Sequence, residues 1–171
     1  HIQDVVALVE DGSLDDIILV GHSYGGMVIT GVGARIGARI RTLVYLDAFL
    51  PGDGESLWDI AGERARKHYI DGQRDTPGLV KPFPRAGVQH PRTLQPLLTM
   101  LEPVRLTGEE AKVANRSYIY ATANLPSSFT RFHDQVRDDP AWTVHEIATG
   151  HMVMLEDPEG LAALLLGEAG R

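Results

Sequence analysis

The beginning of the chain alternates between an amphipathic pattern and short apolar runs. Residues 2–11 carry apolar side chains at helical spacing and precede Gly12, so they are predicted to form a helix. Residues 16–20 (DIILV) and 41–46 (RTLVYL) are apolar runs typical of buried parallel strands. Residues 24–36, which lie between these runs, predict a helix rich in small side chains. The order helix, strand, helix, strand predicts right-handed crossovers and a parallel α/β sheet.

The pattern changes from residue 51 to about residue 115, where proline interrupts mostly polar segments. Short helical stretches are predicted here at residues 55–69 and 91–101. We interpret residues 51–115 as a helical cap insertion over the carboxyl edge of the sheet.

The strand and helix rhythm returns after the insertion. Strands are predicted at residues 117–121 (SYIYA) and 142–147 (WTVHEI), and helices at residues 127–136 and 158–166. The predicted domains are therefore an α/β core, made of residues 1–50 and 116–171, and the cap of residues 51–115.

Composition and charge exclude several classes of function. The chain has 16 Lys plus Arg against 23 Asp plus Glu, a net charge of −7, and 43% hydrophobic residues. This acidic balance argues against binding to nucleic acid or a membrane surface and favours a small neutral or apolar substrate. The absence of cysteine excludes disulfides, thiolate metal sites and a cysteine nucleophile. No apolar run approaches the ~20 residues that span a bilayer, and the start lacks signal-peptide features, so we predict a cytoplasmic protein.

The strongest chemical signal is residues 21–26, Gly-His-Ser-Tyr-Gly-Gly, directly between the first predicted strand and the next helix. It matches the nucleophile elbow G-x-S-x-G, in which glycines permit a tight turn that exposes the serine hydroxyl. Ser23 is the predicted nucleophile, and the backbone N–H of Tyr24 is expected to donate to the oxyanion. A glycine-rich turn of this kind can instead hold a phosphate, but the phosphate fingerprints G-x-G-x-x-G and G-x-x-x-x-G-K-[ST] are absent.

A serine hydroxyl needs a neighbouring base, and His151 is the best candidate. It lies in a loop between the strand at 142–147 and the last helix, and the chain order serine, acid, histidine is that of α/β-hydrolases. The remaining histidines, which are less well positioned, are His1, His22, His68, His90, His133 and His145. Because none of them forms a spaced ligand cluster with carboxylates, we predict no metal and no cofactor.

Four segments, GHSYGGMVITG, VYLDAFLPGDGES, PLLTMLEPVRLTG and GHMVMLEDPEGL, carry a family resemblance. They resemble the α/β-hydrolases that include plant methyl esterases, hydroxynitrile lyases and bacterial esterases of the pyrethroid-hydrolase type. The resemblance implies an α/β-hydrolase fold represented by its carboxyl-terminal part, with earlier strands and an oxyanion-hole loop outside this sequence. We therefore expect a companion amino-terminal segment, or a second copy, to complete the sheet and cover its open edge.

The acid that would complete a catalytic triad with Ser23 and His151 departs from the family pattern. The family places an aspartate just after the strand that corresponds to SYIYA, whereas this chain reads Ala-Thr-Ala-Asn at residues 121–124. Asp47, at the end of the neighbouring strand, resembles the acid of haloalkane dehalogenases, and we prefer it as the partner of His151. The alternatives are that Asp47 caps a turn ahead of Pro51, and that Asn124 orients the histidine or is only a turn residue.

The predicted substrate pocket is apolar, as small-molecule sites usually are. We predict that His22, Trp58, Phe83 and Met152 contact the substrate. Further candidates from the insertion, each of which could equally be plain core, are Leu57, Leu94, Leu97 and Met100.

The predicted function is a serine hydrolase that cleaves a carboxylic ester of a small, largely apolar molecule through an acyl-enzyme. Two rivals remain, a hydroxynitrile-lyase-like lyase and a ligand-binding homologue without catalysis. In the resembling lyases a lysine follows the catalytic histidine, whereas Met152 matches the esterases. The unusual acid is the feature that favours the non-catalytic homologue.

Overall fold

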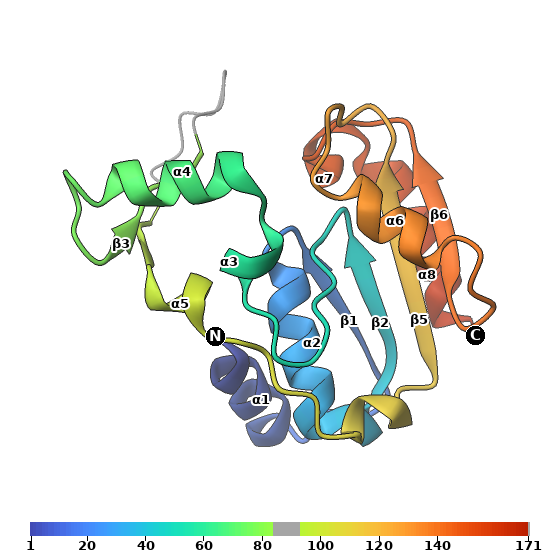
Figure 1. The fold of residues 1–171 in the computed structure, drawn as a ribbon. Coiled ribbons are helices and arrows are strands. Elements are labelled where there is room, and N and C mark those ends of the chain that lie inside the picture. Colours follow the sequence, from blue (N-terminus) through green and yellow to red (C-terminus); the bar gives the residue numbers. More distant parts are fainter. Residues whose placement is uncertain (84–92, 171) are drawn as a thin grey trace.

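The computed structural model describes residues 1–83 and 93–170, which form a parallel sheet with helices on both faces (Figure 1). Residue 171 and residues 84–92, which include His90 and part of the helix predicted at 91–101, lie outside the described chain. In chain order the elements of the sheet and its covering helices are α1 (Ile2–Asp11), β1 (Ile17–His22), α2 (Gly25–Ile36), η1 (Gly37–Arg39), β2 (Ile40–Leu46), η2 (Glu109–Lys112), β5 (Asn115–Ala121), α6 (Thr130–Val136), β6 (Thr143–Ile147), α7 (Val153–Glu156) and α8 (Pro158–Ala169).

The four strands of the main sheet are all parallel and lie in the order β1-β2-β5-β6. The register pairs His22 with Leu46, Leu46 with Ile119, and Ala121 with Ile147 at the carboxyl ends of the strands. The residues that follow each strand therefore lie along one edge of the sheet, which is where parallel α/β folds build ligand sites.

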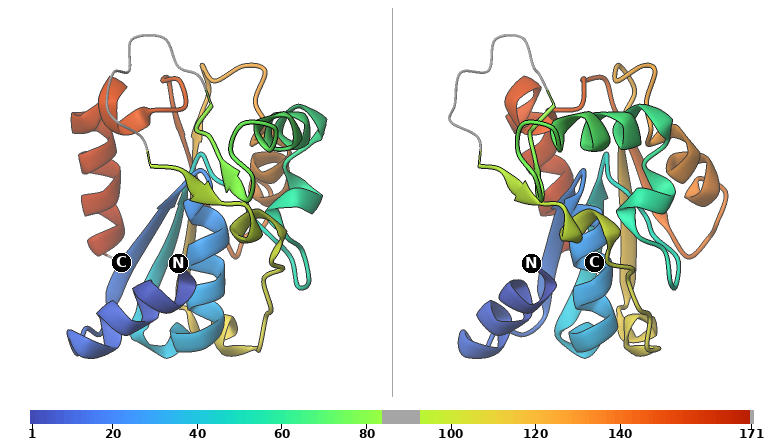
Figure 2. Two further views of the ribbon diagram at one scale, coloured as in Figure 1. Left: turned by 90° about the vertical axis from the view of Figure 1, so that its left-hand side faces the viewer. Right: turned by 60° about the vertical axis from the view of Figure 1, so that its left-hand side comes forward.

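Helices cover both faces of the sheet, and the two central strands β2 and β5 are mostly buried, which explains why these two read as largely apolar runs. One face packs with α1, α2 and α6, and the other packs with α7 and α8 (Figure 2). Successive residues of β2 and β5 alternate between the two cores, as the pleat of a strand requires. The first core contains Leu43, Tyr45, Tyr118 and Tyr120, and the second contains Val44, Leu46, Ile119 and Ala121.

Five described elements of the insertion lie over the carboxyl end of the sheet (Figure 2). They are α3 (Leu57–Ile60), α4 (Glu63–Gly72), the antiparallel pair β3 (Leu79–Val80) and β4 (Gln95–Pro96), and α5 (Leu98–Leu101). The chain then returns to the amino ends of the strands, where η2 packs beside α2 and η1 (Figure 1). The division of the chain into core and cap at residues 50 and 116 stays a prediction.

The helical stretch predicted at residues 55–69 is wrong as a single helix. Ser56 caps α3, because its Oγ accepts from the Asp59 N–H at 3.3 Å and its own N–H donates to Asp59 Oδ2 at 2.9 Å. Gly62 then interrupts the helix with φ +80°, a left-handed conformation that favours glycine, and α4 begins at Glu63. The helix predicted at 91–101 is likewise shorter within the described chain, where only α5 is helical.

Candidate active site

Ser23 lies in the turn between β1 and α2, in a backbone conformation that side chains rarely adopt. Its φ is +57°, in the left-handed region, which a non-glycine residue occupies only when its surroundings enforce it. A Cβ on Gly21 would lie 2.5 Å from the Gly25 carbonyl oxygen, and one on Gly26 would collide with the Phe49 carbonyl oxygen. These two glycines therefore permit the close packing of strand, turn and helix that the elbow motif predicts.

Asp47 occupies the equivalent position on the neighbouring strand. It directly follows β2, as Ser23 follows β1, and its φ of +39° is also left-handed. The Ser23 N–H donates to the Leu46 carbonyl at 3.3 Å, and the Phe49 N–H donates to the Ser23 carbonyl at 3.1 Å. These backbone bonds hold the two turns side by side at the carboxyl edge of the sheet.

His151, in the loop after β6, is hydrogen-bonded to Asp47 across that edge. Its Nδ1 donates to Asp47 Oδ2 at 2.6 Å, and the Asp47 side chain is fully buried. Asp47 also accepts from Asn124 Nδ2 at 2.8 Å and from the Ala121 N–H at 3.4 Å, so three donors compensate its burial. Because a carboxylate can only accept, the proton of a neutral His151 ring lies on Nδ1, which leaves the Nε2 lone pair available as a base.

Several neighbours fix the His151 loop, and the sequence did not reveal them. The Phe129 ring stacks on the His151 ring at a centroid distance of 4.9 Å and an angle of 11°. His22 Nε2 donates to the His151 carbonyl oxygen at 2.7 Å, and the Gly150 N–H donates to Glu156 Oε2 at 2.6 Å. The sequence carries two signals for these contacts. One is the histidine at the first variable position of G-x-S-x-G, and the other is the glutamate shortly after the loop.

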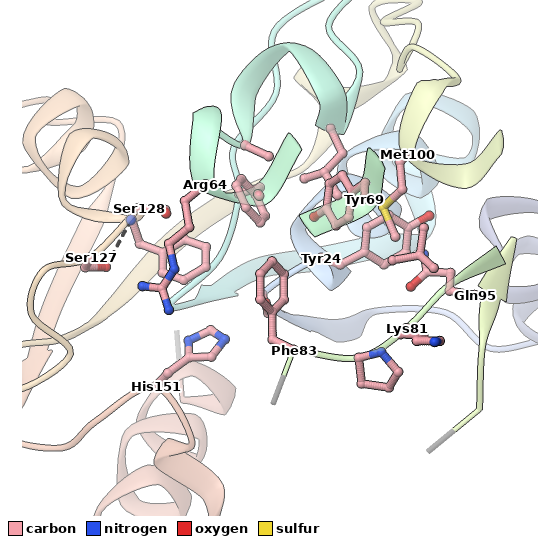
Figure 3. A pocket seen from close by; sticks show the side chains of 18 of the residues that line it. Tyr24, Arg64, Tyr69, Lys81, Phe83, Gln95, Met100, Ser127, Ser128 and His151 are labelled. Carbon is pink, nitrogen blue, oxygen red and sulfur yellow. Dashed lines mark hydrogen bonds between the residues drawn. The ribbon is translucent and has the colours of Figure 1, made fainter. Parts of the chain in front are cut away.

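A cavity of about 450 Å³ opens between this edge and the insertion (Figure 3). Ser23, His151 and Asn124 line it, and so does Phe83, one of the four predicted substrate contacts. Leu57 and Met100 line it as well. The described lining does not include the other predicted contacts, which are His22, Trp58, Met152, Leu94 and Leu97.

Three of these residues have other described neighbours or positions. His22 belongs to β1 and bonds the backbone of the His151 loop. Trp58 packs against the core and lies under the Arg66 guanidinium, 6.0 Å from the ring centroid. Met152 is the residue before α7. Phe83 therefore stays a predicted substrate contact, whereas His22 bonds the His151 loop instead of lining the cavity.

Two tyrosines at or near the site have raised pKa values. Burial raises the pKa of Tyr24, which lines the cavity, above its usual value of 10.0. Burial and then the nearby Asp47 carboxylate raise the pKa of Tyr118, whose hydroxyl donates to the Ala48 carbonyl oxygen at 2.7 Å. Neither phenol is thus a source of negative charge beside His151 at neutral pH.

The described residues offer neither a cluster of metal ligands nor a helix that could span a membrane. Across residues 1–83 and 93–170, no three His, Asp or Glu side chains are grouped so that they could hold a metal ion. Within the same ranges no helix is long and apolar enough to cross a membrane.

The comparison with known families agrees with this architecture. The model of the alpha/beta hydrolase family matches residues 1–164. The chain belongs to the α/β-hydrolase family. This hydrolase is 39% identical over 184 aligned positions to the carbendazim hydrolyzing esterase of Nocardioides sp. (strain SG-4G), and the match covers 96% of this chain and 76% of that esterase. It is an esterase-type member of the family.

Solved structures show the same fold at lower sequence identity. An extracellular α/β-hydrolase from a Paenibacillus species superposes with a TM-score of 0.81 at 24% identity, over 98% of this chain and 77% of that one. A pyrethroid hydrolase from Sphingobium faniae JZ-2 superposes with a TM-score of 0.70 at 22% identity, over 98% of this chain and 76% of that one. The α/β-hydrolase fold predicted from the sequence is confirmed.

Proposed function

We propose that this α/β-hydrolase cleaves a carboxylic ester through an acyl-enzyme on Ser23, with His151 as general base and Asp47 as the acid that orients it. The observation that carries the proposal is the 2.6 Å hydrogen bond from His151 Nδ1 to the buried Asp47, beside a cavity that Ser23 and His151 both line. The left-handed backbone of Ser23 and Asp47 supports it, because such strain clusters at functional sites.

The reaction follows from the roles of these groups. Ser23 Oγ attacks the ester carbonyl carbon while His151 Nε2 takes the hydroxyl proton, which gives a tetrahedral oxyanion and an imidazolium. His151 then returns the proton to the leaving alkoxide, so the alcohol departs and an acyl ester of Ser23 remains. Water repeats the sequence on this ester and releases the carboxylic acid. Asp47 keeps its charge throughout and stabilises the imidazolium.

The Tyr24 N–H is the donor that we assign to the oxyanion. It follows the nucleophile directly and precedes α2, and no described residue accepts a hydrogen bond from it. A preorganised donor of this kind contributes about 3 kcal/mol to transition-state stabilisation. The apolar part of the cavity, which includes Leu57, Phe83 and Met100, suits an apolar portion of the substrate.

Hydrolysis of a short-chain 4-nitrophenyl ester by the wild type and by Ser23→Ala and His151→Ala tests the proposal. We expect turnover by the wild type and a loss of at least 10³-fold in kcat for each variant. When residues act as one catalytic unit, removal of any one of them loses most of the rate enhancement. Release of cyanide from a cyanohydrin without ester turnover would instead identify a lyase. Stoichiometric labelling of Ser23 without turnover would identify a ligand-binding homologue.

A further inference from the structure

The charge of the cavity lining is opposite in sign to that of the chain as a whole. The chain carries a net charge of −7, yet the described lining contains two cations, Arg64 and Lys81, and no aspartate or glutamate. A cleft lined by one sign of charge concentrates ligands of the opposite sign. The overall charge predicts a neutral substrate, whereas the lining favours an anionic one.

The two cations differ in what already neutralises them. Lys81 Nζ forms an ion pair with Asp75 Oδ2 at 2.9 Å, so its charge is compensated within the protein. Arg64 takes part in none of the ion pairs among the described residues. Its guanidinium is therefore the cation of the described lining that is available to an anion.

Arg64 lies in the first turn of α4 and reaches toward the end of the cavity where Ser127, Ser128 and His151 lie (Figure 3). Ser127 Oγ accepts from Asn124 Nδ2 at 3.3 Å and from the Phe129 N–H at 3.0 Å, so its own O–H can donate to a ligand. The Ser128 side chain is exposed at the same end. A guanidinium fork beside hydroxyl donors matches the geometry of a carboxylate.

The opposite part of the lining is apolar. Tyr69 and Met100 lie toward the end of the cavity away from Arg64, and Phe83 lies between the two ends (Figure 3). A molecule that fills both ends would carry an apolar body and an anionic group. The scissile ester would lie beside Ser23 and His151.

We propose that Arg64 is a specificity-determining residue, which selects esters that carry a carboxylate close to the scissile bond. This inference rests on the proposed ester hydrolysis at Ser23. Its basis is a guanidinium that forms no ion pair with any described residue, at the His151 end of a cavity whose described lining has no acidic side chain.

Two matched pairs of esters test this specificity. On the acyl side, mono-4-nitrophenyl glutarate is compared with 4-nitrophenyl pentanoate, and on the alcohol side, 3-butyryloxybenzoate is compared with phenyl butyrate. The measured quantity is the ratio of kcat/KM for the charged member to that for the neutral member of each pair. The variants are Arg64→Gln, Arg64→Lys and the control Lys67→Gln, which removes a cation from α4 at a position outside the cavity lining.

In at least one pair we expect Arg64→Gln to lower the ratio about tenfold, the size of one charge-assisted contact near the surface. Arg64→Lys keeps the charge but loses the planar fork, so it should keep only part of the ratio, and Lys67→Gln should leave the ratio unchanged. A ratio that Arg64→Gln does not alter in either pair would overturn the proposal. An equal fall in Lys67→Gln would also overturn it, because the effect would then be one of overall charge.

Calorimetric binding to Ser23→Ala separates this inference from the proposed function. If the wild type turns over none of the four esters, the proposed hydrolysis fails, and binding decides the role of Arg64. Tighter binding of a charged ester than of its neutral partner, lost in Ser23→Ala/Arg64→Gln, would support the anion site. Equal binding of both members of each pair would reject it.

Discussion

Asn124 Nδ2 donates to Asp47 Oδ2 at 2.8 Å, and this is the same oxygen that accepts from His151 Nδ1 at 2.6 Å. Asn124, which lies in the turn after β5, is therefore a partner of the carboxylate that follows β2. The two residues share one hydrogen-bonded unit, and only one of them carries the charge.

The first prediction ranks these two residues. Asp47→Asn removes the charge that orients and stabilises the His151 ring, and we expect kcat to fall by roughly 10³-fold or more. Asn124→Ala removes one of three donors to Asp47, and we expect a fall of about tenfold, since a hydrogen bond to a charged group contributes ~1.5–3 kcal/mol. Steady-state kinetics on one ester measures both. The opposite ranking would reject Asp47 as the acid.

The second prediction concerns Asn124→Asp and its dependence on pH. A second carboxyl beside the buried Asp47 repels it, so the pKa of the introduced carboxyl is raised above its unfolded value of about 3.9. A raised carboxyl pKa destabilises the folded state at neutral pH, and this penalty disappears as pH falls through the raised pKa. We expect the Tm of this variant to be lowered at pH 7 and to approach that of Asn124→Ala near pH 4. A difference in Tm between Asn124→Asp and Asn124→Ala that does not change with pH would contradict the close contact between residue 124 and Asp47.

The third prediction compares two glycines of the elbow. A methyl group at Gly26 would collide with the Phe49 carbonyl oxygen, whereas a methyl group at Gly25 would meet nothing within 4 Å. We expect Gly26→Ala to lower the free energy of unfolding by about 1–3 kcal/mol, the usual cost of overpacking. Gly25→Ala should change it by less than about 0.5 kcal/mol. Denaturant unfolding measures both, and equal losses would show that the close approach of Phe49 is unimportant.

The fourth prediction tests His22 as a support of the His151 loop. His22→Ala leaves the His151 carbonyl without its 2.7 Å donor, and we expect kcat to fall about tenfold with a smaller change in KM. His22→Gln, whose amide can donate, should recover part of the loss. A change confined to KM would instead support the prediction from the sequence that His22 contacts the substrate.

Much of the fold could be predicted because local pattern and global topology agree. Strands β2 and β5 are buried and contribute apolar side chains to both cores, β1 begins with four apolar residues, and the helix predicted at residues 2–11 matches α1. The short pair β3 and β4 gave no signal, since each strand has only two residues. The break at Gly62 cannot be predicted from the pattern, because a single glycine inside a helical pattern does not reveal its φ.

The site was predictable only as far as it follows from strand ends. Ser23, Asp47 and His151 all follow strands of the sheet, so topology alone brings them to one edge. The substrate contacts depend on how the insertion folds back over that edge, and hydrophobicity does not distinguish a cavity wall from core. Trp58 and Phe83 are both large aromatic residues of the insertion, yet only Phe83 belongs to the described lining.

Mass spectrometry after treatment with a fluorophosphonate probe tests the nucleophile most directly. Peptide mapping of the folded wild type should find a single phosphonate adduct on Ser23. Unfolding the protein before treatment, or substituting His151→Ala, should abolish the adduct, because the serine is activated only by the neighbouring base. A folded, ester-hydrolysing protein whose Ser23 stays unmodified, or whose adduct forms at another residue, would contradict the account.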